Sequence, residues 1–295
     1  MAQIQANGIA IEVETTGKPS DPPIVLIRGL GTQLIQWPAK FVQRLVDRGF
    51  QLVMFDNRDV GLSQKFESAG TPDLAALMAG QAEPAYQLTD MAEDVRGVLD
   101  VLEIESAHIV GMSMGGMIAQ LVALARPERT RSLVSIMSSS GRPDLPPPSP
   151  EAAAALTSRP ERPDDRDSVI EHGMKTRRVF GSPGFPTDDA ELRQQVGAAY
   201  DRCHYPQGVA RQLAAVLMGG SRVEQLKTIT VPTLVIHGAD DPLVPAEGGR
   251  DTAKNIPGAR IEIIEGMGHE ISPGLAERLA DLIADCASKA DAARA

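Results

Sequence analysis

The chain has 295 residues, and its 29 Lys and Arg against 39 Asp and Glu give a formal net charge of −10 at pH 7. This acidic balance disfavours nucleic acid as a partner. With 42% hydrophobic and 23% charged residues, the composition is that of an ordinary globular protein, which excludes a disordered or collagen-like chain. A chain of this length can bury a sizeable core.

The N-terminal residues, the lengths of the apolar runs and the cysteines indicate where in the cell the protein is located. The first residues contain no basic stretch followed by an apolar one, and no run of eighteen apolar residues occurs in the sequence. The two cysteines, Cys203 and Cys286, do not form the spacing pattern of a disulfide framework. We therefore expect a cytoplasmic protein with no membrane span.

Short apolar runs alternate with amphipathic segments along the chain. Runs of branched residues between turn signals predict strands buried on both faces, and apolar residues spaced three and four apart predict helices packed on them. This alternation predicts an α/β fold with right-handed crossovers. In chain order, the predicted elements are a hairpin of residues 4–6 and 9–15, strands 24–27, 52–55, 107–110, 133–137, 233–236 and 260–264, and helices 41–47, 91–102, 117–125 and 275–287.

The alternation stops after Ser138. A proline-rich stretch follows at residues 143–150, and the next buried-strand pattern begins only at Val231. Because long structureless loops are uncommon inside compact domains, we expect the stretch between them to form a helical cap over the strand ends. We predict a core of residues 1–138 and 231–295 and a cap of residues 139–230. The predicted cap helices are 168–180, 189–203 and 208–217, and four aromatic residues could face a site beneath them: Phe180, Phe185, Tyr200 and Tyr205.

The strongest chemical signal is the sequence Gly111-Met112-Ser113-Met114-Gly115. It directly follows a predicted strand and precedes a predicted helix, which is the setting of a nucleophilic serine at a sharp turn. Small residues are needed there because a side chain at either glycine would collide with the turn. The sequence therefore predicts that Ser113 is a nucleophile, although a serine that caps a helix is the simpler alternative.

A nucleophilic serine needs a histidine to take its proton and a carboxylate to orient that histidine. Of the five histidines, His269 is the best placed, because it follows the last predicted strand in a glycine-rich loop. The loop after the preceding strand supplies two carboxylates, Asp240 and Asp241. We expect Asp241 to be the acid, with Asp240 as the alternative. The chain order Ser, Asp, His accompanies this type of nucleophile turn.

The oxyanion that forms during acyl transfer needs two donors that are fixed in place before the reaction. The backbone N–H of Met114 follows the nucleophile and lies at a predicted helix N-terminus, which also favours negative charge. The loop after the first core strand supplies the second donor, which we assign to the backbone N–H of Leu30, since its flanking residues Gly29 and Gly31 allow close approach.

Several motifs together resemble those of the α/β-hydrolase fold superfamily, over nearly the whole length of the chain. Within it, the chain is similar to small bacterial carboxylesterases and to esterases of the aclacinomycin methylesterase type. The resemblance implies a mostly parallel, eight-stranded sheet flanked by helices, with a helical cap, and no cofactor or metal. The matching segments are residues 28–31, residues 55–63, the turn around Ser113, residues 237–245 and residues 266–269.

One departure from the family concerns the loop that carries Leu30. Members commonly have His-Gly where this chain has Arg28-Gly29. We favour a structural role for Arg28, with pairing to a carboxylate such as Asp56. The alternative is that Arg28 faces the pocket and attracts an anionic substrate. Residues 56–63 are expected to brace the loop, with charges that pair with one another.

Apolar residues near the proposed catalytic groups are candidates for a substrate pocket. Met112 and Met267 flank these groups in sequence, and Trp37 follows the loop that carries Leu30. Flexible thioethers adapt to varied apolar shapes, which suits a broadly tolerant esterase. Residues of this kind also form ordinary core, so both interpretations stay open. No Cys or His spacing typical of a zinc site is present.

These features predict a serine hydrolase that cleaves small to medium apolar carboxylic esters through an acyl-enzyme. An enol-lactonase, a carbon–carbon bond hydrolase or a cofactor-free perhydrolase would use the same three residues. A non-catalytic small-molecule receptor of the same fold is an alternative of another class, because a fold alone does not fix function. The expected partner is a small ester molecule, and the sequence gives no oligomeric state.

Overall fold

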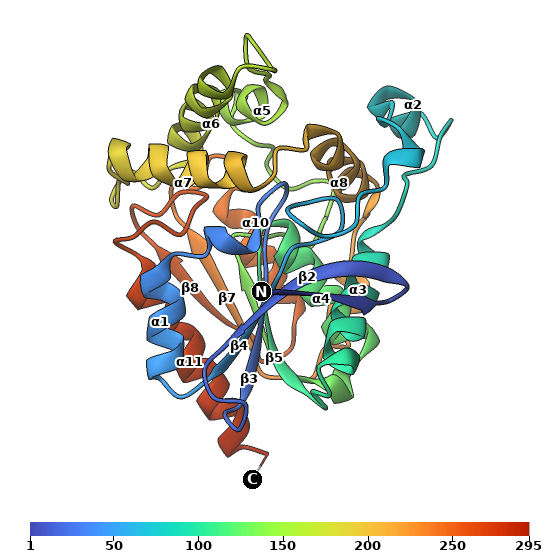
Figure 1. The fold of residues 1–295 in the computed structure, drawn as a ribbon. Helices are drawn as coiled ribbons and strands as arrows, with labels where there is room; N and C mark the ends of the chain where they lie inside the picture. The colour runs from blue at the N-terminus through green and yellow to red at the C-terminus, as the bar shows by residue number, and fades with distance from the viewer. Residues whose placement is uncertain (295) are drawn as a thin grey trace.

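The computed structural model describes residues 1–294 and is built around one eight-stranded sheet (Figure 1). The strand order is β1-β2-β4-β3-β5-β6-β7-β8, in which β2 is antiparallel to β1 and β4 and all other neighbours are parallel. This is the predicted α/β class. The strands are β1 (Ala2–Ala6), β2 (Ile9–Thr16), β3 (Pro23–Ile27), β4 (Gln51–Phe55), β5 (Ala107–Met112), β6 (Thr130–Ile136), β7 (Thr233–Gly238) and β8 (Arg260–Ile264).

Helices cover both faces of the sheet. The helices α1 (Ala39–Asp47) and α11 (Ala276–Ala292) lie on one face, and α3 (Leu88–Val101) and α4 (Met114–Ala125) lie on the other (Figure 1). Side chains alternate along each strand, so Ile24 of β3 belongs to the core on the α1 face and its neighbour Val25 to the core on the α4 face. The sheet is thus buried on both faces, as the continuous apolar runs predicted.

The N-terminal hairpin forms as predicted. β1 pairs with β2 through a turn at Asn7 and Gly8, whose φ angles are 51° and 74°. Positive φ at both turn positions is the backbone of the tight hairpin turn that Asn-Gly favours. The hairpin forms one edge of the sheet, away from the strands that carry the candidate site.

The segment between β6 and β7 is helical and lies above one end of the sheet (Figure 1). Residues Ile170, Met174 and Leu192 form a small core of their own between two of its helices. Within the described residues, this segment contains helices and no strand. Its helices are α5 (Pro150–Thr157), α6 (Arg166–Phe180), α7 (Asp189–Arg202), α8 (Pro206–Met218) and α9 (Val223–Leu226).

Several helices differ from the predicted ones. α4 begins at Met114, directly after Ser113, three residues earlier than predicted, and α11 extends to Ala292. The sequence analysis missed α10 (Ala246–Asn255) because its sequence, AEGGRDTAKN, has no apolar stripe. Its two glycines allow it to pack closely: a Cβ at Gly249 would collide with the His237 ring. Further short helices are η1 (Leu34–Gln36), η2 (Glu67–Ala69), α2 (Leu74–Met78) and η3 (Pro127–Arg129).

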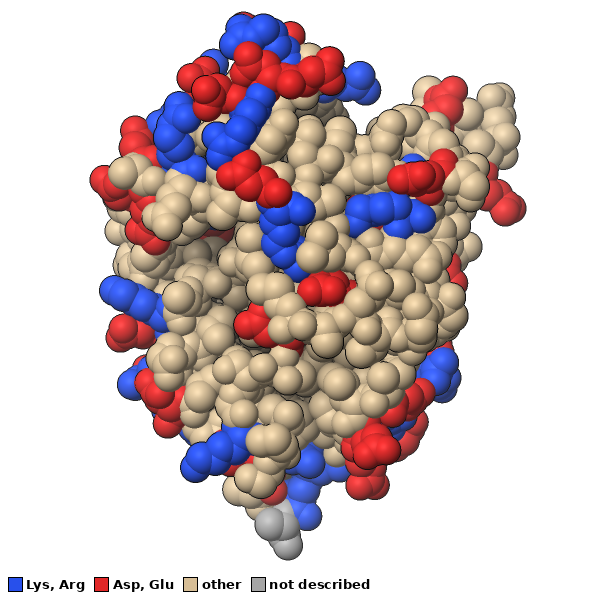
Figure 2. All heavy atoms as spheres, viewed as in Figure 1, with Lys and Arg blue, Asp and Glu red and all other residues tan. Residues whose placement is uncertain are grey.

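The surface carries charges of both signs. On the face drawn in Figure 2, Lys and Arg lie among Asp and Glu over the helices α5 to α7, where ion pairs such as Arg166–Asp201 at 2.7 Å occur. Exposed pairs of this kind contribute little to stability. Within residues 1–294, no helix combines the length and the apolar character needed to cross a bilayer.

Candidate functional site

Ser113 lies at the turn between β5 and α4. Its φ of 56° and ψ of −123° are in a region that non-glycine residues rarely adopt. The turn is held by the Ser113 N–H, which donates to the Ile136 carbonyl at 2.8 Å. A Cβ at Gly111 would collide with the carbonyl of Gly115, and one at Gly115 would collide with the carbonyl of Ile27. The glycines therefore permit the sharp turn that presents the hydroxyl.

The hydroxyl of Ser113 is the first member of a hydrogen-bonded line. Its Oγ lies 2.9 Å from Nε2 of His269, and Nδ1 of His269 lies 2.7 Å from Oδ2 of Asp241. An ionised carboxylate can only accept, so the His269 proton lies on Nδ1 and Nε2 is free to accept from the serine. The structure thus brings together the three residues that the sequence predicted, from loops 156 and 28 positions apart.

The Asp241 carboxylate is held in its ionised form. Burial would raise its pKa, but electrostatic and hydrogen-bond contributions from the His269 and His237 imidazoles outweigh burial and hold the pKa below its ordinary range. Its other oxygen accepts from the backbone N–H groups of Leu243 and Val244 at 2.9 and 2.8 Å. A fixed anion at this position orients the histidine and stabilises its protonated form.

Of the two neighbouring carboxylates, only Asp241 contacts His269 in the described part of the chain. The Asp240 side chain turns the other way, and its Oδ2 accepts from the Gly266 N–H at 2.7 Å. This bond fixes the loop between β8 and His269. Adjacent side chains in an irregular loop point in different directions, which separates the roles of these two residues.

The two backbone donors assigned to an oxyanion hole lie next to Ser113. Met114 is the first residue of α4, and a Cβ at Gly29, the neighbour of Leu30, would lie 3.1 Å from Cβ of Ser113. Within residues 1–294, the N–H groups of Leu30 and Met114 donate to no backbone carbonyl in a turn, loop or cap. Both are therefore available to a ligand oxygen.

Residues 28–31, which we call the oxyanion loop, are supported by residues 56–63, but not in the expected way. The Asn57 side chain donates to the Arg28 carbonyl at 3.0 Å. The predicted pairing of Arg28 with Asp56 was wrong, because the Asp56 carboxylate instead accepts from Arg202 at 2.6 Å and from the Leu34 and Leu62 N–H groups. Asp56 is thus fully occupied by partners from α7 and from its own surroundings.

The expectation that the charges of residues 56–63 pair with one another was also wrong. Arg58 pairs with Asp94 of α3 at 2.6 Å, and Asp59 pairs with Arg211 of α8 through two bonds of 2.8 Å. All four side chains are nearly fully buried. Each charge therefore joins this loop to another element, and two of these elements, α7 and α8, belong to the predicted cap.

The segment after α6 contacts the loop that carries His269. The His269 N–H donates to the Phe180 carbonyl at 2.7 Å, and the Gly268 N–H donates to Oγ of Ser182 at 3.0 Å. The ring of Phe180 also meets the His269 ring edge-on, with centroids 6.4 Å apart. Of the four cap aromatics, Phe180 thus lies against the candidate site.

The three proposed pocket residues lie in the core on the α1 face of the sheet. Trp37, Met112 and Met267 are 4%, 6% and 0% exposed, and Trp37 stacks on Phe41.

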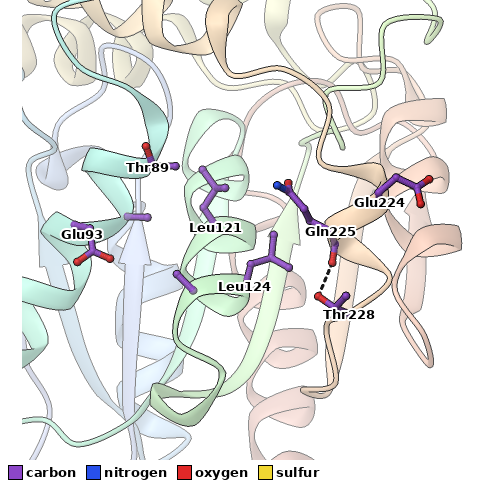
Figure 3. Close-up of a pocket in the computed structure, with 9 residues that line it drawn as sticks. Thr89, Glu93, Leu121, Leu124, Glu224, Gln225 and Thr228 are labelled. Atoms are coloured by element: carbon purple, nitrogen blue, oxygen red, sulfur yellow. Dashed lines mark hydrogen bonds between the residues drawn. The ribbon is translucent and has the colours of Figure 1, made fainter.

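A separate surface groove of about 540 Å³ lies between α3, α4 and α9 and is lined by residues such as Leu121, Leu124 and Gln225 (Figure 3). This groove contains none of the residues that the sequence singled out.

Three residues between β6 and β7 touch the site loops but were not predicted to do so. Gln212 of α8 accepts from the Gly31 N–H, and Arg177 of α6 lies beside Glu270, with 3.8 Å between their charged groups. Ser182 binds the histidine loop. No local pattern marks these residues, because each acts on a loop far away in the sequence.

Comparisons with known proteins identify the family and the fold of this chain. A family described as serine aminopeptidase, S33, matches residues 19–273. The chain is 31% identical to the rhodomycin D methylesterase DnrP of Streptomyces peucetius over 288 residues, 92% of each chain. It is 30% identical to a 2-hydroxy-6-oxononadienedioate/2-hydroxy-6-oxononatrienedioate hydrolase of Cupriavidus pinatubonensis over 253 residues, 83% of this chain and 80% of the relative. The fold is similar to that of the meta-cleavage product hydrolase CumD of Pseudomonas fluorescens, with a TM-score of 0.77 and 22% identity over 98% of both chains.

Proposed function

Because this chain belongs to the α/β-hydrolase superfamily, within the family described as serine aminopeptidase, S33, and is an ester-hydrolysing enzyme, we propose that it cleaves carboxylic esters with Ser113, His269 and Asp241 as its catalytic residues. The observation that carries the proposal is the hydrogen-bonded line from Ser113 through His269 to Asp241. The same three groups, in the same order along the chain, activate a serine in enzymes of this fold.

In the first half of the reaction, Oγ of Ser113 attacks the ester carbonyl while Nε2 of His269 takes the hydroxyl proton. The negative charge of Asp241 stabilises the imidazolium that forms. The backbone N–H groups of Leu30 and Met114 bind the oxyanion of the tetrahedral intermediate. His269 then gives its proton to the leaving alcohol, and the acyl group stays on Ser113.

In the second half, a water molecule replaces the alcohol. His269 takes a proton from this water, which attacks the acyl carbonyl, and the same two N–H groups bind the second oxyanion. The proton on His269 returns to Oγ of Ser113 as the acid leaves. Both halves use one base and one oxyanion site, so a single fixed geometry serves the whole cycle.

We also propose that residues 139–230 act as a cap over this site, with the core formed by residues 1–138 and by 231 to the C-terminus; Ala295 lies outside the described residues. The contacts of Phe180, Ser182 and Gln212 with the two site loops support a cap that helps to shape the site. The cap then determines which esters enter. Trp37 and Met112, each a few per cent exposed, would contribute apolar surface beneath the acyl chain, whereas Met267 is fully buried in the core.

The test combines turnover with covalent trapping. We expect hydrolysis of p-nitrophenyl esters from acetate to palmitate, with an optimum chain length, and at least about a 10⁴-fold loss of kcat in Ser113→Ala. A fluorophosphonate should add one adduct to Ser113 of the wild type, identified by mass spectrometry of peptides. Wild-type turnover by Ser113→Ala, or an adduct on another residue, would refute the assignment.

A second candidate is hydrolysis of a lactone or of a carbon–carbon bond by the same residues. It is favoured by the similarity to the Cupriavidus hydrolase and by the structural neighbour that is an enol-lactonase from Burkholderia xenovorans, with a TM-score of 0.73. Folded protein that is trapped by the fluorophosphonate at Ser113 but turns over no simple ester would favour this candidate.

A further inference from the structure

Arg28 is a buried cation that pairs with no carboxylate of residues 1–294. The residue is 5% exposed, and its guanidinium lies over the ring of Trp37, 4.7 Å from the ring centroid. Within the described residues, its side chain makes one hydrogen bond, from Nε to Oγ1 of Thr32 at 3.2 Å. A buried charge is costly unless it is paired, and one hydroxyl and one aromatic face compensate it only in part.

Part of the Arg28 side chain helps to brace the oxyanion loop, because its Nε donates to Oγ1 of Thr32 and that hydroxyl donates to the Gly29 carbonyl at 2.9 Å. That loop is also held through the backbone carbonyl of Arg28, which accepts from Asn57, and through the Gly31 N–H, which donates to Gln212. The two terminal nitrogens of the guanidinium, which make no hydrogen bond within the described residues, take no part in this bracing.

A second cation lies close to the first. Burial, and next the positive charge of Arg177, lower the pKa of Arg28 to about 9, so Arg28 is charged at neutral pH. Burial also lowers the pKa of Arg177, but an arginine side chain keeps its proton in a protein at neutral pH. The Arg177 side chain is 24% exposed, and its one acidic neighbour within residues 1–294 is Glu270, 3.8 Å away. Oε1 of Glu270 also accepts from the Ser182 N–H. Two guanidinium groups and one carboxylate leave one net positive charge.

Each of these two cations lies close in the chain to a residue that contacts the catalytic groups. Arg28 precedes Gly29, where an added Cβ would lie 3.1 Å from Cβ of Ser113. Arg177 lies one turn before Phe180, whose carbonyl accepts from the His269 N–H. A ligand that reaches between the two arginines therefore extends from the position where the ester carbonyl is attacked.

A further unsatisfied donor lies beside the Arg28 guanidinium. Nε1 of Trp37 is buried and has no hydrogen-bond partner in the described part of the chain. Guanidinium and indole N–H groups donate only, so the missing partner is an acceptor. A ligand with one negative charge fits the net charge better than a phosphate, which carries about −1.5 to −2.

Building on the proposed esterase function, we propose that Arg28 and Arg177 form an anion subsite that binds an ionised carboxylate on the acyl part of the ester. The substrates are then monoesters of dicarboxylic acids. The planar guanidinium of Arg28, held over the ring of Trp37, would offer its two terminal nitrogens to the two carboxylate oxygens. This subsite would select acidic esters over neutral esters of the same length.

The kinetic test compares p-nitrophenyl hemiglutarate with the neutral methyl p-nitrophenyl glutarate. We expect the wild type to favour the acidic ester in kcat/KM by at least about tenfold, equivalent to about 1.4 kcal/mol. Arg28→Met and Arg177→Met should each lower this ratio toward one. The control Arg193→Met, at a half-exposed arginine of α7, should leave the ratio unchanged. Equal wild-type rates on the two esters, or a ratio unaffected by both variants, would overturn the subsite.

The binding test does not depend on turnover. Trp37 is the only tryptophan of the chain, so its fluorescence reports on the ring that lies under Arg28. In folded Ser113→Ala, glutarate should cause a saturable change in Trp37 fluorescence, and dimethyl glutarate should not. The double variant Ser113→Ala, Arg28→Met should show no change in fluorescence with glutarate. No saturable change with glutarate, or tighter binding of inorganic phosphate, would refute the carboxylate subsite even if Ser113 is the nucleophile. If glutarate changes the fluorescence but the wild type hydrolyses no ester, the proposed esterase function is refuted and the anion subsite is not.

Discussion

The backbone N–H of Gly31 donates a hydrogen bond of 2.8 Å to Oε1 of Gln212, a fully buried residue of α8. The Nε2 of the same side chain donates to the Arg58 carbonyl at 2.8 Å. One amide therefore joins a cap helix to the oxyanion loop and to residues 56–63. Since Leu30 is adjacent to Gly31, the direction of the proposed oxyanion donor depends on a residue of the predicted cap.

We predict that Gln212→Met lowers kcat on p-nitrophenyl butyrate by up to about 10²-fold with little change in KM. Loss of the amide frees Gly31 and lets the Leu30 N–H move away from the oxyanion, and small misplacements in an active site have effects of this size. The variant should also lose about 1–3 kcal/mol of unfolding free energy, because it leaves a buried donor and acceptor unsatisfied. Steady-state kinetics and urea unfolding measure both effects.

Two further variants separate positioning from general stability. Gln207→Met, at an exposed position of the same helix, should leave kcat and stability unchanged. Gln212→Glu keeps an acceptor for Gly31, so it should recover more of kcat than Gln212→Met even if it is less stable. If kcat follows stability across these variants, Gln212 has no positioning role.

The role of Asp241 predicts that Asp241→Asn lowers kcat/KM by about 10⁴-fold while the protein stays folded, because an amide cannot hold the required histidine tautomer. The neighbouring Asp240→Asn is the matched control. Its amide oxygen still accepts from Gly266, so we expect less than a tenfold loss. Similar losses in both variants, measured with one ester at one pH, would contradict the assignment of the acid.

The buried pair of Asp59 with Arg211 predicts a pH-dependent contribution to stability. Burial would raise the pKa of Asp59, but hydrogen bonds from Arg211 and the Phe66 N–H hold it below its ordinary value. A carboxylate with a depressed folded-state pKa stabilises the protein above its unfolded pKa of about 3.9, and this contribution is lost as the pH falls toward the folded-state value. Asp59→Asn should therefore lower the unfolding free energy by about 3–5 kcal/mol at pH 7.

The difference in unfolding free energy between the wild type and Asp59→Asn should stay constant from pH 8 to 5 and should become smaller below about pH 4. Urea unfolding at several pH values measures it. Asp189→Asn, which breaks an exposed pair with Arg178, is the control and should change stability by less than about 1 kcal/mol at any pH. A difference for Asp59→Asn that widens in acid would show that the pair does not stabilise the ionised form.

The space around two glycines, Gly111 at the Ser113 turn and Gly197 in α7, predicts opposite effects of substitution by alanine. Gly111→Ala should destabilise the protein by about 1–3 kcal/mol or more and abolish turnover, because its Cβ would meet the Gly115 carbonyl. Gly197→Ala in α7 should be neutral or stabilise by up to about 1 kcal/mol, since its Cβ would make only ordinary contacts, the nearest at 3.5 Å. Thermal unfolding distinguishes the two, and a stable, active Gly111→Ala would refute the steric argument.

The sequence by itself determined the class of fold, the elements of the sheet and the three residues that the structure brings together around Ser113. These signals are local. Runs of branched residues identify buried strands, and the glycines around Ser113 serve a turn of five residues. His269 and Asp241 follow strands whose carboxyl ends meet at one edge of a parallel sheet. The helix α10 was not predicted because it packs through glycines rather than through an apolar stripe.

Only the tertiary structure decided which charged and polar groups pair. Asp56 could have met Arg28, 28 positions away, but it meets Arg202, and Gly31 meets Gln212 across 181 positions. An arginine can pair with any carboxylate that packing brings near it, and the sequence has 29 basic and 39 acidic residues. Which of them meet depends on how the helices between β6 and β7 lie against the rest of the chain. The partners of the oxyanion loop, and the lack of a carboxylate partner for Arg28 within residues 1–294, therefore follow from packing and not from any local pattern.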